Sequence, residues 1–126
     1  MTVEQAVKTF LLGKVSITNI VSTRIYYSVL PQTPTYPAIS FFRVSNIRQH
    51  DIDIGSAYYQ FDIWSLMYIQ SVELANEIRK ALQREKSIMS GIPIIQGVYQ
   101  NEMDLYEPAT KLFHIALDIK IIYRGV

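Results

Sequence analysis

The chain has 126 residues and a net charge of +1 at pH 7, which suits one domain over residues 1–126 and argues against a strongly basic surface for nucleic acid. Hydrophobic residues make up 49% and charged residues 18%, which excludes global disorder. Because cysteine is absent, disulfides and thiolate metal sites are excluded. We expect a soluble protein without a secretory signal or a membrane-spanning segment.

The N-terminal segment predicts a helix that begins with a capping box. Thr2 and Gln5 have the spacing at which a threonine caps the first turn and a glutamine reaches back to it. Apolar residues then recur on one helical face as far as Gly13, which favours a helix end. A short helical turn at 17–21 and a first strand at 24–29 are expected next.

Three prolines between positions 31 and 37 predict a stiff, extended connector, because proline fits neither a helix interior nor a central strand. A strand is expected at 38–47. Its apolar residues change phase between Phe41 and Phe42, which predicts a bulge or burial on both faces. The polar segment 48–56 predicts a hairpin loop longer than the tight two-residue kind.

The next segment changes from strand to helix periodicity. Alternation predicts a strand with Tyr59, Phe61 and Ile63 on one face. The helix is expected at 71–85, with Ser71 as the N-cap. Its buried stripe is expected to hold Leu74, Ala75, Ile78, Ala81 and Leu82. The face opposite Tyr59 is expected to hold Tyr58, Gln60, Asp62 and Trp64.

The C-terminal third predicts a weak strand at 94–99, an acidic loop at 101–108 and a final strand. That strand has strict period-two alternation from Phe113 to Tyr123, so one of its faces lies in the core. The order of elements favours an α+β fold, an antiparallel sheet of four to five strands with two main helices packed on one face.

No residue pattern predicts catalysis. His50, Asp51 and Asp53 could attract a divalent metal, but a solvated hairpin tip explains them more simply. His114 and Asp118 share a strand face four residues apart, which is too far for a catalytic pair, so we expect His114 to be a surface or subunit-contact residue. No serine lies in a G-x-S-x-G turn, and no glycines form a phosphate-binding loop. We therefore expect no enzyme, no metal and no cofactor.

Several features instead favour a protein-binding role. Nine tyrosines in a chain with few charges suit an interface, since tyrosine combines an apolar ring with a polar end. The face with Tyr58, Gln60 and Trp64 is too apolar to be freely solvated, so either helices or another protein must cover it.

Three stretches together resemble the small phage tail-completion or tail-terminator proteins of the head–tail joining region. They are "RIYYSVLPQTPTYPAISFFRVS", "YQFDIWSLMYIQSVELANEIRKAL" and "DLYEPATKLFHIALDIKIIY". The first is similar to that family's strand, proline-bearing connector and next strand entry. The second is similar to its central strand and helix, and the third to its acidic loop and long final strand. The resemblance covers nearly the whole chain.

The resemblance implies a non-enzymatic virion protein that assembles as a ring, usually a hexamer, in the tail or neck of a phage or prophage particle. Its partners would be copies of itself, the major tail tube protein and the head-completion or connector protein. DNA would only pass through the lumen, and no membrane is involved. Assembly would take place in the host cytoplasm.

We expect the 48–56 hairpin and the 101–108 loop to make the protein contacts. The interaction residues predicted from loop position are Arg48, Gln49, His50, Asp51, Asp53, Tyr58, Glu102, Asp104 and Tyr106. Three alternatives stay open on the sequence: a small ligand-binding or enzymatic α+β domain, a head–tail connector adaptor of the neck, and a nucleic-acid adaptor.

Overall fold

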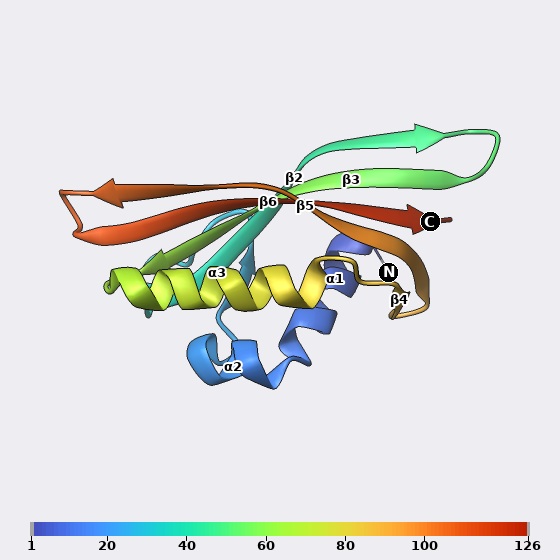
Figure 1. Ribbon diagram of the computed structural model, residues 1–126. Coiled ribbons are helices and arrows are strands. Elements are labelled where there is room, and N and C mark those ends of the chain that lie inside the picture. Colours follow the sequence, from blue (N-terminus) through green and yellow to red (C-terminus); the bar gives the residue numbers. More distant parts are fainter. Residues whose placement is uncertain (1, 126) are drawn as a thin grey trace.

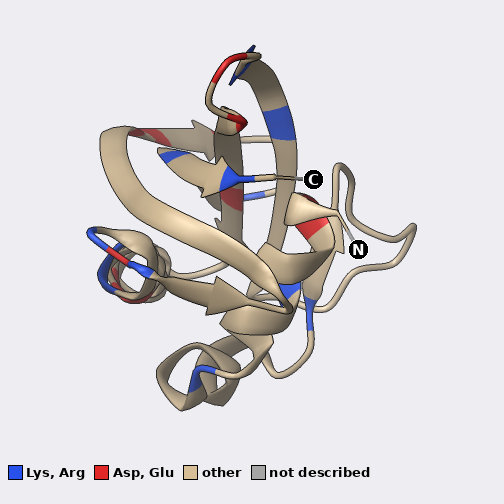
Figure 2. Ribbon diagram, turned by 90° about the vertical axis from the view of Figure 1, so that its right-hand side faces the viewer, with Lys and Arg blue, Asp and Glu red and all other residues tan. Residues whose placement is uncertain are grey.

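The computed structural model describes residues 2–125 and has an α+β fold, with its helices on one face of a curled sheet (Figures 1 and 2). The helices in this range are α1 (Val3–Leu12), α2 (Val15–Val21) and α3 (Tyr68–Leu82). The strands are β1 (Ile25–Tyr27), β2 (Ala38–Gln49), β3 (Ile54–Ser65), β4 (Ser87–Met89), β5 (Ile92–Glu107) and β6 (Leu112–Arg124). None of the described helices is long and apolar enough to cross a bilayer.

The N-terminal helix forms as its sequence predicts. The Gln5 backbone N–H donates to the Thr2 hydroxyl at 3.1 Å, and the Thr2 N–H donates to the Gln5 side chain at 2.8 Å, which confirms the capping box. Gly13 caps the C-terminus. Glu4 joins this helix to the sheet, since it accepts from the Tyr59 hydroxyl at 2.9 Å and pairs with Arg43 at 3.4 Å.

The sheet has the strand order β1-β2-β3-β6-β5-β4. The β1–β2 pair is parallel and the others are antiparallel. The six strands of residues 2–125 exceed the four to five that we expected, because the short edge strand β4 was not predicted. The expected α+β class and the single helical face are confirmed.

The core lies between the helices and one face of the sheet, which we call the inner face. Phe41 and Phe61 stack there with ring centroids 5.0 Å apart, and Tyr59 packs beside them. Leu74, Ile78 and the odd-numbered residues of β6 from Ile115 to Tyr123 close this core, whereas Phe113 is only partly buried. The strict alternation of β6 is therefore confirmed as the signature of one buried face.

Two long hairpins extend beyond the helices in opposite directions (Figure 1). We call the distal part of β2–β3 the first arm and the distal part of β5–β6 the second arm. Their turns cover residues 50–53 and 108–111. The first arm begins near a register shift between Arg43 and Ser45, the bulge predicted by the phase change. The second arm follows a shift between Tyr99 and Asn101.

Two predicted loops are wrong. The hairpin loop is four residues, 50–53, because β2 and β3 continue into the arm. The acidic segment 101–108 is not a loop, since most of it is the second half of β5. Two register shifts, at 94–96 and 99–101, break the period-two pattern of that strand and concealed it.

The start of α3 also differs from the prediction. The helix begins at Tyr68 rather than Ser71, and its N-cap residue is Met67, which makes no side-chain cap. Ser71 is buried inside the helix, where its hydroxyl donates to the Tyr68 carbonyl at 2.6 Å. Ser65, just before the helix, provides a hydrogen-bond acceptor at its start instead, because its hydroxyl accepts from the Met67 N–H at 3.1 Å.

Candidate interaction surfaces

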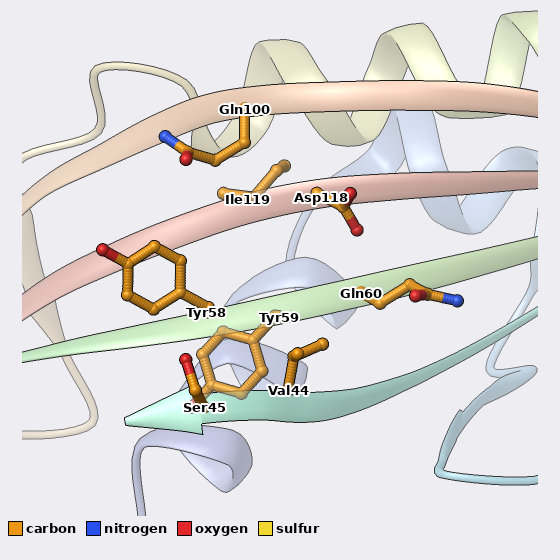
Figure 3. A pocket seen from close by; sticks show the side chains of 8 residues that line it. All are labelled: Val44, Ser45, Tyr58, Tyr59, Gln60, Gln100, Asp118 and Ile119. Atoms are coloured by element: carbon orange, nitrogen blue, oxygen red, sulfur yellow. The ribbon is translucent and has the colours of Figure 1, made fainter. Parts of the chain in front are cut away.

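The outer face of the sheet, opposite the helices, carries a shallow hollow of ≈ 280 Å³ (Figure 3). Its lining comes from β2, β3, β5 and β6 and consists of Val44, Ser45, Tyr58, Tyr59, Gln60, Gln100, Asp118 and Ile119. Asp118 is the acid in this lining. Burial and the negative charge of Asp62 raise the pKa of Asp118 above its usual value of 3.8. The lining contains no lysine, arginine or histidine side chain.

Beside this hollow lies a polar group that the sequence did not predict. His114 Nε2 lies 2.8 Å from Asp62 Oδ1, and the Gln60 amide donates to the same oxygen at 2.7 Å. Trp64 stacks on the His114 ring at 3.9 Å and donates from its indole to Ser40 at 3.3 Å. We expected His114 to be a surface or subunit-contact residue, but its side chain is only 15% exposed.

The pair of His114 and Asp62 was not predicted from the sequence, because the two residues are 52 positions apart. The antiparallel β3–β6 register places Trp64 opposite His114 and Asp62 opposite Ala116, so the pair is a diagonal contact across two strands. Only a prediction of that strand pairing could have found it. Since each polar group has a partner within the protein, the arrangement is a satisfied structural network.

The end of the first arm holds five of the predicted interaction residues, Arg48 and Gln49 on β2 and His50, Asp51 and Asp53 in the turn. Arg48 pairs with Asp53 at 3.2 Å and donates to the Gly125 carbonyl at 3.3 Å. Gln49, His50 and Asp51 are exposed. Within residues 2–125, no group of three or more histidine or acidic side chains is placed to hold a metal ion. The end of the first arm therefore carries both signs of charge, from Arg48 on β2 and from Asp51 and Asp53 in the turn (Figure 2).

Three further predicted residues, Glu102, Asp104 and Tyr106, lie on the second arm. Asp104 accepts from the Tyr68 hydroxyl at 2.7 Å, which raises the pKa of Tyr68. The Tyr106 ring lies 4.8 Å from that of Phe113. Glu102 is half-buried on the same strand. The structure therefore divides the predicted residues between two arms that point away from each other, with Tyr58 on the outer face between them (Figures 1 and 3).

The outer face is not covered by helices, since all three lie on the inner face (Figure 1). The proline-rich connector shares a hollow of ≈ 410 Å³ with Asp62 and Trp64, so it lines one end of that face. Elsewhere apolar side chains stay exposed, including Val44 at 59% and Ile47 at 58%. A further exposed apolar group that we did not predict, Leu66, Met67 and Ile69, lies at the start of α3.

Comparison with known proteins adds three findings. The family model described as tail completion protein gp17 matches residues 5–124. No curated protein matches the sequence. Among solved structures, a chain from "Virion of native gene transfer agent (GTA) particle" superposes with a TM-score of 0.81 at 13% identity, over 98% of this chain and 95% of that chain. Another gives a TM-score of 0.66 at 8% identity, over 100% and 99% of the two chains. At these identities the two structures establish a shared fold.

Proposed function

Because this chain belongs to the tail completion protein gp17 family, whose model matches residues 5–124, we propose that it completes the tail of a phage or phage-like particle as a ring-forming terminator. The family is one of structural tail proteins, and the chain is not an enzyme. The family match is the observation that carries the proposal. The similar fold of a chain from a gene transfer agent virion supports it.

In this proposal the protein acts as one domain and forms a closed ring, a hexamer, at the end of the tail tube. One annular surface contacts the last ring of the tube protein, and the other contacts the head connector. DNA crosses the ring only through its lumen. The protein resides in the tail or neck of the virion and assembles in the host cytoplasm.

The exposed chemistry of the two arms supports contacts with other proteins. The first arm would use Arg48, Gln49, His50, Asp51 and Asp53 near its turn, with Tyr58 on the outer face. The second arm would use Glu102, Asp104 and Tyr106. Burial of apolar residues such as Val44 and Ile69 would supply affinity, and the charged residues would select the partner.

Deletion of the gene from the particle that encodes it tests this function. We expect tails of abnormal length that do not join heads, counted by negative-stain electron microscopy, and a loss of infectious or transducing titre. Supplying the chain from a plasmid should restore both. Tails of normal length joined to heads in the deletion strain would refute the proposal.

A further inference from the structure

Two strand edges of this chain are unpaired along most of an arm. The β1–β2 pairing ends at Phe41, so residues 42–49 bond through one edge only, to β3. The β4–β5 pairing ends at Ile94. Beyond it, the last backbone hydrogen bonds on this edge of β5 join Gly97 to Arg84 and Glu85. In the described part of the chain, no strand pairs with residues 98–107 on that side. Open edges of this length are templates for another strand.

The two edges carry opposite charge. Residues 42–49 contain two arginines, Arg43 and Arg48, and no acid. Residues 98–107 contain three acids, Glu102, Asp104 and Glu107, and no base. An edge paired with its own kind in a second copy would therefore bring like charges together, whereas pairing of the two different edges brings opposite charges together.

The faces of the two edges match as well. On β2, Phe42 and Ile47 lie opposite Gln60 and Ser56, which places them on the outer face. Arg43 lies opposite Tyr59, which places it on the inner face. By the same comparison with β6, β5 directs its exposed apolar residues Met103 and Leu105 outward and Glu102 and Asp104 inward.

The strand directions complete the match. Because β2, β3, β6 and β5 are successively antiparallel, β5 runs opposite to β2. A second copy added to the sheet in the same orientation therefore presents its β5 antiparallel to β2. Apolar residues then meet on the outer face and opposite charges on the inner face. Since the open segments belong to arms that point in opposite directions, the copies are offset along the strands (Figure 1).

We propose that residues 42–49 of one copy pair, as an antiparallel β-ladder, with residues 98–107 of the next copy. The occupant of each open edge is thus a second copy of this chain. This contact joins two different surfaces, so it repeats head to tail and closes into a ring where the rotation permits. The inference rests on the proposed ring function and names the surface that builds the ring.

Cysteine cross-linking tests the contact, since the natural chain contains no cysteine. Ile47→Cys and Met103→Cys alter exposed outer-face residues, one on each edge. With a short bis-maleimide, a chain that carries both cysteines should give a ladder of covalent oligomers in assembled tails. Each single variant should give monomer, and an equal mixture of the two should stop at dimer. A matched control replaces Met103→Cys with Ile88→Cys on β4, which is 72% exposed and should give no ladder.

Charge exchange provides an independent measurement. We expect the double variant Arg43→Glu/Arg48→Glu and the double variant Glu102→Lys/Asp104→Lys each to lose ring assembly when expressed alone. Their equal mixture should recover it, because acidic and basic edges again alternate around a ring with an even number of subunits. The mass of the assembled species, measured by light scattering or native mass spectrometry on isolated tail ends, reports the result.

Each outcome decides the inference separately from the function. Normal tails from the double-cysteine variant without a cross-linked ladder would overturn the edge contact and leave tail completion standing. Efficient dimers from Ile47→Cys alone would also overturn it, since they would mean that like edges pair. A deletion strain with normal tails would instead refute the function.

Discussion

At the scale of single residues, the outer face of the sheet holds two carboxylates that repel each other. Asp118 is half-buried, and both its burial and the charge of Asp62 raise its pKa. Asp62 is held by His114 and Gln60, whereas Asp118 lines the hollow at the centre of the sheet. The structure therefore carries a destabilising charge on a surface that we expect to meet other proteins.

The raised pKa of Asp118 predicts how stability depends on pH. The folded protein binds the Asp118 proton more tightly than the unfolded chain, so this residue's destabilising effect is absent below a pH of about 4 and grows as pH rises through the folded pKa. Asp118→Asn should therefore unfold at a higher urea concentration than the natural chain at pH 7, with the difference vanishing near pH 3. Asp51→Asn, in the exposed turn, is the control. Equal gains at both pH values would contradict this.

Sequence reasoning identified residues well where one strand or helix decides their environment. The Thr2–Gln5 capping box and the alternation of Phe113 to Tyr123 are local patterns, and both are confirmed. The partner of His114 was missed because it depends on the register between two strands distant in sequence. The predicted interaction residues were chosen from loop position, and their contacts stay predictions.

At the scale of elements, the end of α3 and the middle of β5 fit together through a glycine. The Gly97 N–H donates to the Glu85 carbonyl at 3.1 Å, and the Gly97 carbonyl accepts from the Arg84 N–H at 2.7 Å. A Cβ atom at Gly97 would overlap the Leu82 carbonyl oxygen. Because the obstacle is backbone, the helix end and the strand would have to separate.

Gly97→Ala should destabilise the fold by about 3 kcal/mol, the upper end of the range for overpacking. Thermal unfolding followed by circular dichroism measures this as a lower midpoint. Gly13→Ala is the matched control, since its φ of −82° suits alanine and a Cβ there would lie 3.4 Å from the Phe10 carbonyl oxygen. A loss for Gly97→Ala no larger than that for Gly13→Ala would mean that helix and strand can separate at little cost.

Hydrophobic periodicity predicted α3 correctly but did not predict the second half of β5. The buried stripe of α3 was predicted, because a helix that covers a sheet must present apolar residues to it. The second half of β5 was mistaken for a loop, since exposed polar residues and two register shifts leave a two-stranded arm without alternation. An arm that projects beyond the helices buries little, so its sequence carries no sign of a core.

At the scale of the whole molecule, the buried core and most of the residues that we propose as contacts lie in different parts of the fold. The inner face, the helices and the centre of the sheet hold the buried apolar residues. The arms carry most of the residues that we propose to contact other proteins, and their distal parts extend beyond the helices (Figure 1). Changes near the turn of an arm should therefore affect assembly without unfolding the core.

The triple variant Gln49→Ala/His50→Ala/Asp51→Ala tests this separation. All three side chains are exposed near the turn of the first arm, so the melting temperature should stay within a few degrees of the natural value, while complementation of a deletion strain is lost. Glu73→Ala/Lys80→Ala, exposed on α3, is the control and should complement. Normal tails with the triple variant would remove the first arm from the contact surface.

The register shifts near the roots of the arms mark a change in burial along the strands. Each inserts one unpaired residue and bends the strand locally, between Arg43 and Ser45 in one arm and between Tyr99 and Asn101 in the other. The strands beyond these shifts bury few apolar side chains, so we expect the arms to open locally at a lower free-energy cost than the centre of the sheet. Hydrogen exchange should therefore find faster exchange for amide protons in the arms than for those at the centre of the sheet.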